Sequence, residues 1–362
     1  MTYRAEAGRK YGADSAIIEA DGKFSAAAFW ESHMKKSMRS IIAVGTLVLF
    51  SGTTLAQQTL QVNVFPGGFN WPIWVAQERG MFAKNGVELK ITLTPNSVAQ
   101  LTGLIDGKFD IGMTAIDNLI AYREGQGEAK VDGPDLVAVM GADNGFLRLV
   151  AVPEIKSYAD LKGKTVSVDA RTTGYAFVLF EMLDRAGLKE PAYQVERAGG
   201  VLQRFQQLLE KKHAATLLLS PFEVQAEAKG FNRLGDGLAT LKTYQGLVAG
   251  VRQSWANQNR KAVTGYIKAY VEAVDWLYEP ANREAAIAIF LKNLPQAGQG
   301  GAEASYRVLL NPKEGFQKRG QIDLEGVRTA LELRSKWSES KKRLTDPAKY
   351  YDGSFHREAV AQ

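Results

Sequence analysis

The chain has 362 residues, 45% of them hydrophobic and 23% charged, a composition typical of a globular protein with about two domains. The net charge of +6 is mild and dispersed, which argues against a nucleic-acid partner. Because the sequence has no cysteine, disulfide bonds, thiolate chemistry and a lipid-anchored N-terminal cysteine are excluded.

Residues 34–56 have the pattern of a secretory signal peptide. A basic stretch precedes an apolar run at 41–49 that is too short to span a membrane, and a small-x-small pattern predicts cleavage after Ala56. The alternative is a buried core helix. Residues 1–33 are interpreted as an unstructured extension or an upstream translation-start error. The predicted mature chain, 57–362, is assigned to the Gram-negative periplasm as a soluble protein.

Residues 60–81 predict a strand, a loop of glycine and aromatic residues, and a helix. Apolar and polar residues alternate over 60–64, as expected for a half-buried strand. The loop then presents Phe69, Asn70 and Trp71 at the N-terminus of the helix, where α/β proteins bind ligands. We interpret this loop as one wall of a small-molecule cleft. The alternative is that its aromatic residues belong to the core.

The chain then alternates short strands with helices, which predicts an α/β fold of βαβ units with a mainly parallel sheet. Further strands are predicted at 88–93, 109–114, 136–140, 146–152, 165–168, 193–195, 214–219 and 244–251, with helices at 98–105, 115–122, 175–186 and 201–210. The remainder is helical, with segments at 261–278, 285–291, 302–309 and 324–337.

Two stretches of the chain share one pattern. In both 104–111 and 208–215, a helix ends in charged residues and a short strand follows directly. We interpret them as parts of two similar lobes whose helix starts face one cleft, although α/β proteins repeat this order generally. The predicted crossings lie near residues 150 and 246. They divide the mature chain into lobe 1, at 57–150 and 247–362, and lobe 2, at 151–246.

Four strand-to-helix loops supply the candidate ligand contacts. The predicted ligand-binding residues are Phe69, Asn70, Trp71, Asn96, Ser97, Asp117, Asn118, Arg171, Thr172, Thr173 and Ser220. Aromatic side chains offer stacking faces, and Arg171 at a helix start is a candidate anion site. Each polar residue has a structural alternative: Asn96 as a helix cap, Asp117 as a complement to the helix dipole, and Arg171 as a solvated side chain.

The sequence contains none of the common catalytic or metal-binding motifs, such as HExxH, GxSxG or a P-loop. His213 and His356 are interpreted as surface residues, and Asp143 and Asn144 as a turn. No catalytic residue, metal or cofactor is therefore predicted. An enzyme on this fold would need an acid or base in the cleft, for which Asp117 and Asp169 are the candidates.

Three segments resemble a known family. They are PIWVAQERGMF at 72–82 with GVEL at 86–89, DGKFDIG at 106–112, and DLKGKTV at 160–166. They are similar to blocks of the periplasmic solute-binding proteins of nitrate/sulfonate/taurine-type ABC importers, a family that includes binders of thiamine pyrimidine precursors. The resemblance implies a type II periplasmic-binding-protein fold, with two α/β lobes, a two-crossing hinge and a helical C-terminal extension.

The resemblance also implies a function. The expected protein is a monomer that closes around a small organic solute and delivers it to an ABC permease in the inner membrane. An anionic or aromatic solute (a sulfonate, a carboxylate or a pyrimidine) would stack on Phe69 and Trp71 and place its anionic end at Arg171. Asp117 and Asn118 would hydrogen-bond a polar group. The alternatives are a ligand-sensing module for a receptor and an enzyme on the same fold.

Overall fold

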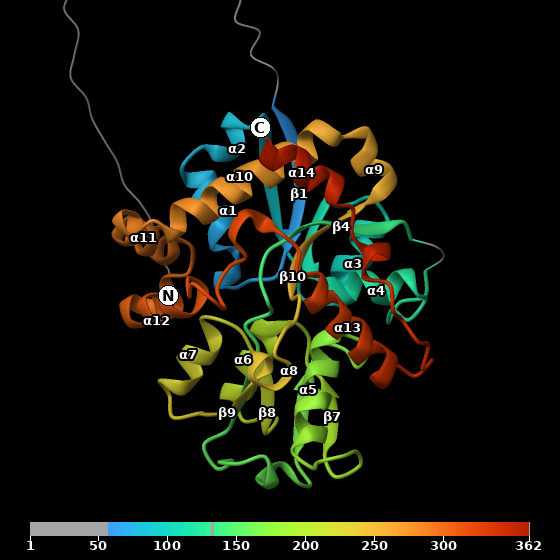
Figure 1. Cartoon of the computed structure of the whole chain (residues 1–362). Coiled ribbons are helices and arrows are strands. Elements are labelled where there is room, and N and C mark those ends of the chain that lie inside the picture. The colour runs from blue at the N-terminus through green and yellow to red at the C-terminus, as the bar shows by residue number, and fades with distance from the viewer. Residues whose placement is uncertain (1–56, 132–133, 362) are drawn as a thin grey trace, which may run out of the picture. The chain divides into compact units, whose positions relative to one another are not determined.

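The computed structural model describes residues 57–131 and 134–361, and all of them belong to the compact unit Thr54–Gln362 (Figure 1). The predicted signal peptide at 34–56 and the predicted extension at 1–33 lie outside the described residues. Among the described residues, no helix combines the length and the apolar character that crossing a membrane would require.

The first sheet has five strands in the order β2-β1-β3-β10-β4. Strand β1 is parallel to β2 and β3, whereas β10 is antiparallel to β3 and β4. Apolar residues at alternate positions of β1 are buried, and β3 is buried throughout, as a central strand of a covered sheet is. The edge strand β4 is also buried throughout. The strands span β1 Gln58–Val64, β2 Val87–Leu93, β3 Ile111–Ala115, β4 Leu136–Gly141 and β10 Leu247–Arg252.

The second sheet repeats this topology in the order β7-β6-β8-β5-β9. Strand β6 is parallel to β7 and β8, and β5 is antiparallel to β8 and β9. The strands span β5 Arg148–Ala151, β6 Thr165–Val168, β7 Gln194–Arg197, β8 Ala215–Leu218 and β9 Asn232–Asp236. In each sheet four of the five strands run in one direction, in agreement with the predicted mainly parallel sheet. The sheets are nevertheless mixed, because the strand that enters from the other lobe, β10 or β5, runs against its neighbours.

Two crossings join the lobes, at residues 142–147 and between β9 and β10. Val150 pairs within the second sheet, so the first crossing precedes the boundary that the sequence suggests. An apolar strand pattern does not tell which of two sheets a strand enters. The second crossing contains the short helix α8 (Gly237–Leu241) and ends directly before β10, close to the predicted position at 246.

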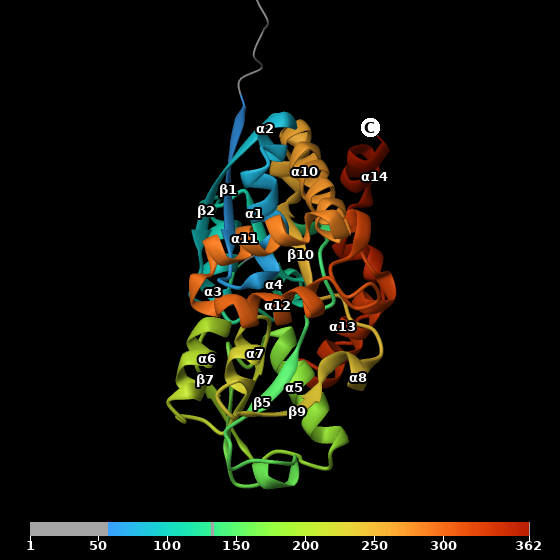
Figure 2. The same ribbon diagram turned by 90° about the vertical axis from the view of Figure 1, so that its left-hand side faces the viewer.

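Helices cover both sheets and include the predicted C-terminal extension (Figures 1 and 2). In lobe 1 they are α1 Trp71–Glu78, α2 Met81–Lys84, α3 Ser97–Ile105, α4 Ile116–Arg123, α9 Gln253–Gln258 and α10 Arg260–Tyr278. In lobe 2 they are α5 Gly174–Arg185, α6 Val201–Leu209 and α7 Phe222–Glu227, besides α8. The extension contains α11 Arg283–Asn293, α12 Gly298–Leu309, α13 Leu324–Trp337 and α14 Gly353–Ala361.

Two helices of the extension contact lobe 2. Helix α12 packs against α7, and α13 packs against both α4 of lobe 1 and α5 of lobe 2 (Figures 1 and 2). We call α13 the strap helix, because it connects the lobes in addition to the two crossings.

Candidate functional site

A cavity of about 60 Å³ lies between the lobes. Its walls are mainly apolar, with Phe65 and Phe69 from lobe 1 and Leu179, Val201 and Leu217 from lobe 2. Its polar lining is Asn118, Asp143, Ser167, Asp169, Thr173, Tyr175 and Arg204. Apolar walls with a few polar groups are typical of small-molecule sites.

Asp143 lies in the first crossing, and its carbonyl accepts a hydrogen bond from the N–H of Gly246 in the second crossing at 2.9 Å. Its Oδ1 accepts hydrogen bonds from the backbone N–H of Gly145 at 2.7 Å and of Leu247 at 3.0 Å. Its Oδ2 is buried and has no hydrogen-bond partner among the described residues. Burial raises the pKa of the Asp143 carboxyl to about 6, because the charged form is poorly solvated, although the two backbone bonds act in the opposite direction.

Asp169 and Arg204 bring charge to the lobe 2 side of the cavity. The Asp169 Oδ2 accepts a hydrogen bond from the backbone N–H of Ser97, across the lobe interface, at 2.8 Å. The Arg204 guanidinium donates to Thr216 Oγ1 and to the carbonyls of Gly199 and Leu217, at 2.8–3.2 Å. Burial lowers the pKa of Arg204, and the charge of Asp169 opposes this shift.

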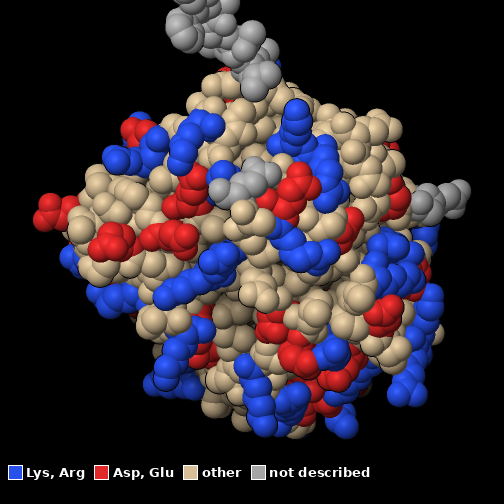
Figure 3. Space-filling view, turned by 45° about the horizontal axis from the view of Figure 1, so that its top comes forward, with Lys and Arg blue, Asp and Glu red and all other residues tan. Residues whose placement is uncertain are grey.

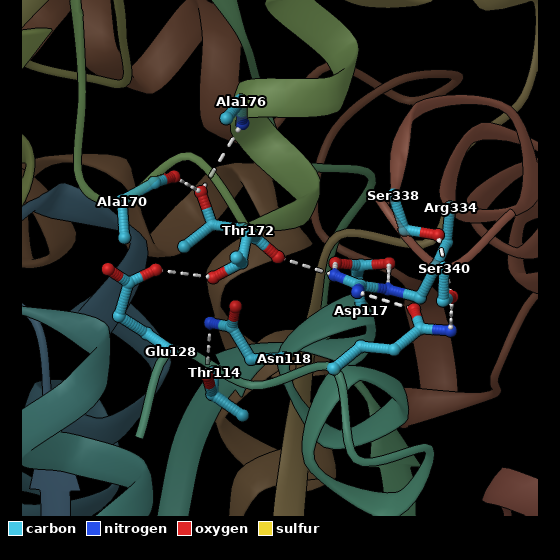
Figure 4. A network of polar contacts seen from close by, with 12 residues as sticks. Thr114, Asp117, Asn118, Glu128, Ala170, Thr172, Ala176, Arg334, Ser338 and Ser340 are labelled. Carbon is cyan, nitrogen blue, oxygen red and sulfur yellow. Dashed lines mark hydrogen bonds and ion pairs between the residues drawn. The ribbon is translucent and has the colours of Figure 1, made fainter. Parts of the chain in front are cut away.

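Three predicted residues line the cavity: Phe69, Asn118 and Thr173. Phe69 presents its ring as part of the apolar wall. The Asn118 amide nitrogen donates to Thr114 Oγ1 at 2.9 Å (Figure 4). Thr173 is the N-cap of α5, where its Oγ1 accepts from the N–H of Ala176 at 3.4 Å.

Asn70 and Trp71 belong to the interior of lobe 1 instead. The Asn70 side chain donates to the carbonyl of Phe65 at 2.6 Å and holds its own loop in shape. Trp71 is fully buried, its indole N–H donates to the carbonyl of Ala286 at 3.0 Å, and its ring meets Phe290 edge-on at 4.6 Å. This placement argues against the predicted stacking of Trp71 on a ligand and supports the core alternative.

Four other predicted residues cap a helix or form hydrogen bonds between the lobes. Asn96 caps α3, accepting from the N–H of Ala99 at 2.8 Å, while Ser97 meets Asp169 through its backbone. Thr172 Oγ1 donates to Glu128 of lobe 1 at 3.0 Å. Ser220 hydrogen-bonds Glu223 through its side chain, and its carbonyl accepts from the N–H of Gly68 at 3.0 Å. None of the four lines the cavity.

Asp117 is fully buried and paired with Arg334 of the strap helix, both side chains being 0% exposed. Arg334 Nε donates to Asp117 Oδ1 at 2.7 Å, and the guanidinium also donates to the carbonyl of Thr172 in lobe 2 at 2.6 Å. Figure 4 shows Asp117 directed toward Arg334 and the adjacent Asn118 directed toward Thr114. The Asp117 carboxylate is therefore used by the protein itself, which argues against its predicted contact with a ligand.

Arg171 also lies away from the cavity. Its guanidinium donates to both carboxylate oxygens of Glu190, at 2.8 and 3.0 Å, and its side chain is 48% exposed. The anion-binding role predicted for Arg171 therefore has no support in its placement, and the solvated alternative fits.

Sequence reasoning missed two charged groups at the cavity, Asp143 and Arg204. Arg204 is in the middle of a predicted helix, and Asp143 is in a predicted turn, so neither stands at a strand-to-helix junction. The sequence carries no clear signal for Asp143, because the pattern does not tell that the strands on either side of it belong to different lobes. His213 and His356 are buried rather than on the surface, at 3% and 8% exposure.

No cluster of three or more His, Cys, Asp or Glu side chains suited to a metal ion occurs in the described parts of the chain. On the face shown in Figure 3, Lys and Arg side chains are interspersed with Asp and Glu.

The chain is similar to several known proteins. A family model described as NMT1/THI5 like matches residues 70–283, more than half of the chain. A Brucella abortus protein, provisionally described as a binding protein, is 28% identical over 164 residues, which are 43% of this chain and 47% of the relative. The matched region thus spans about half the length of that relative.

Two solved structures share the fold. The periplasmic aliphatic sulphonate binding protein SsuA from Escherichia coli has a TM-score of 0.61 at 20% identity, and the alignment covers 84% of this chain and 99% of SsuA. The periplasmic nitrate-binding protein NrtA from Synechocystis PCC 6803 has a TM-score of 0.66 at 13% identity, with coverages of 84% and 89%. From this fold and the family match, we conclude that the chain belongs to the NMT1/THI5-like family and has the periplasmic-binding-protein fold of ABC-importer solute-binding proteins.

Proposed function

We propose that this chain is a periplasmic solute-binding protein that captures a small organic solute between its two lobes and delivers it to an ABC import permease. The observation that carries this proposal is the cavity, which is lined by both lobes and by the crossing that joins them. A solute there contacts every part that moves when two lobes close, so binding favours the closed arrangement.

The solute would be held mainly by its apolar part. Phe69 and Leu179 line the cavity from opposite lobes. The aromatic or aliphatic part of a solute bound between them would be removed from water, which favours binding. Asn118 and Thr173 supply hydrogen-bonding groups at the starts of α4 and α5. The proposed site does not include the other predicted ligand-binding residues, because they do not line the cavity.

Binding without chemistry is part of the proposal. The polar groups at the cavity include no histidine or cysteine, and of the two acids considered for catalysis, Asp117 is neutralised by Arg334. A monomer, a cleaved signal peptide and a membrane permease as the partner complete the proposal. A sensor that presents its closed form to a receptor is the second candidate, and an adjacent permease gene would favour transport over it.

A thermal-shift screen of sulfonates, carboxylates, amines and pyrimidines tests the function, because a ligand that binds the folded state raises the melting temperature. The best hit should bind with micromolar or better affinity in calorimetry and be recovered unchanged. We expect Phe69→Ala to weaken its binding at least ~10-fold through lost contact area. Arg171→Ala is the matched control outside the cavity and should bind normally. Equal effects of the two variants would contradict the site, and turnover of the hit would favour an enzyme.

A further inference from the structure

Asp143 combines two properties that no other carboxylate at the cavity has. It is 1% exposed, and one of its oxygens joins the first crossing to the start of β10, where the second crossing ends, through the N–H groups of Gly145 and Leu247. It also lines the cavity. A group bound to Asp143 would therefore touch the hinge itself.

The second carboxylate oxygen, Oδ2, is buried without a hydrogen-bond donor, and none of the ion pairs among the described residues includes Asp143. A buried carboxylate oxygen that lacks a donor is unfavourable, so a donor supplied by a ligand at this point is bound with the full benefit of a charge-assisted bond. The same burial raises the pKa of Asp143 to about 6, as expected for a poorly solvated carboxylate.

The other charged groups at the cavity do not reverse this preference. Asp169 adds a second carboxylate, whose Oδ1 is also buried without a partner. Arg204 is the single cation of the lining, and it already donates to a hydroxyl and two carbonyls of lobe 2. The described lining thus holds two acids against one base.

One backbone donor at each of three nearby helix starts is also in use. The N–H of Ser97 at α3 donates to Asp169, that of Ile116 at α4 donates to the carbonyl of Gly246, and that of Ala176 at α5 donates to Thr173. One of the N–H groups with which each of these three helix N-termini could bind an anion is therefore engaged by the protein.

We propose that Asp143 accepts a hydrogen bond from an N–H group of the ligand, and that the solute is a small amine or amidine with an apolar or aromatic body rather than an oxyanion. This inference rests on the proposed function and names the class of solute that the site takes. It makes Asp143 the residue that determines specificity by the sign of the ligand's charge.

The test uses the full chain and two probes of matched shape and opposite charge, benzamidine and benzoate. Calorimetry at pH 7.5 should show binding of benzamidine and much weaker binding of benzoate. In Asp143→Asn, Oδ1 can still accept from both backbone N–H groups, but an amide NH₂ replaces Oδ2. We expect benzamidine to bind about 10-fold to 100-fold more weakly and benzoate to bind equally well or better.

Glu223→Gln is the matched control. Burial also raises the pKa of Glu223 to about 6, and its Oε2 is likewise buried without a partner, but Glu223 does not line the cavity. This variant should keep the benzamidine-to-benzoate ratio of the unmodified chain.

A pH titration measures the same preference without a substitution. Benzamidine affinity should rise between pH 5 and pH 7.5 as Asp143 ionises. Tyr175 and Tyr270, which feel the charge of Asp143, keep their protons in this range because burial raises the pKa of both, and Arg204 stays charged. The rise should be absent in Asp143→Asn and present in Glu223→Gln.

The outcomes separate the two proposals. If benzoate binds more tightly than benzamidine, or if Asp143→Asn leaves the ratio unchanged, the inference about Asp143 is overturned and the solute-binding function stands. If neither probe binds and the screen finds no other ligand, both proposals fall.

Discussion

The lobe interface holds two buried carboxylates with opposite surroundings. Asp117, at the strap helix, is enclosed by the guanidinium of Arg334 and is fully buried. Asp143, at the cavity, is almost as deeply buried but keeps one oxygen without a donor. Burial alone therefore does not identify a ligand-binding acid. What matters is whether the protein itself satisfies the charge.

The largest effect is expected at the strap helix. Arg334→Met leaves the Asp117 carboxylate buried and unpaired, and the free energy of unfolding should fall by about 3–5 kcal/mol. Urea denaturation measures this loss. Asp117→Asn in the same chain should recover part of it, because it removes the orphaned charge.

Lys292→Met provides the control for this variant. Lys292 pairs with Glu78 at the surface, where both side chains are largely exposed, and its loss should cost no more than about 1 kcal/mol. If Arg334→Met costs no more than this control, the strap helix does not depend on its buried pair.

The pH dependence of stability should distinguish the cavity carboxylate. The pKa of Asp143 is about 6 in the fold and near 3.8 in the unfolded chain, so the folded state loses stability as pH rises from about 4 to about 6. Asp143→Asn lacks this loss. Relative to the unmodified chain it should gain up to about 3 kcal/mol over that interval and stay level above it, measured by denaturation at several pH values.

For Glu124, stability should change with pH in the opposite direction from that expected for Asp143. Burial raises its pKa, but bonds from Lys342, Lys349 and Tyr350 outweigh this and lower the pKa to about 2. Its contribution is present above about pH 4.5 and is lost as pH falls toward 2. Equal pH profiles for Asp143→Asn and Glu124→Gln would contradict the contrast between open and satisfied carboxylates.

A smaller effect on stability is expected for a polar residue that caps a helix instead of contacting the solute. Asn96 accepts the N–H of Ala99 at the start of α3, so Asn96→Ala should lower the free energy of unfolding by about 1 kcal/mol. Ligand affinity should be unchanged. A loss of affinity without a loss of stability would restore Asn96 to the binding site.

The smallest effect is expected for the exposed pair of lobe 2. Arg171→Met removes a surface ion pair with Glu190 and should change stability by less than about 1 kcal/mol. Calorimetry with the best ligand should give the same affinity as for the unmodified chain. A marked loss of affinity would show that Arg171 leaves Glu190 to meet the solute.

The sequence was informative about loops and less so about side chains. The strand-to-helix loops at 69–71, 96–97 and 117–118 lie at or near the lobe interface, since the ends of parallel strands meet on one edge of a sheet. The direction of each side chain was not predictable. Adjacent residues at a helix start point about a quarter turn apart, so Asp117 meets the strap helix whereas Asn118 lines the cavity.

Partners that are distant in the sequence account for the remaining differences. Arg334 is 217 residues beyond its partner Asp117. Ala286, whose carbonyl accepts the hydrogen bond from the Trp71 indole N–H, is 215 residues beyond Trp71. No periodicity or local motif links such pairs. Both arise from the helical extension, whose location over the lobe interface was not evident from its amphipathic pattern.

Two bonds across the interface involve backbone atoms alone: Gly68 N–H to the Ser220 carbonyl at 3.0 Å, and Gly200 N–H to the Pro95 carbonyl at 2.8 Å. A Cβ at Gly200 would lie 2.7 Å from that carbonyl oxygen, so glycine is needed for the close approach. Because these two contacts do not depend on side chains, they remain available when residues facing the solute are exchanged. Substitutions that alter selectivity therefore leave this backbone part of the lobe contact in place.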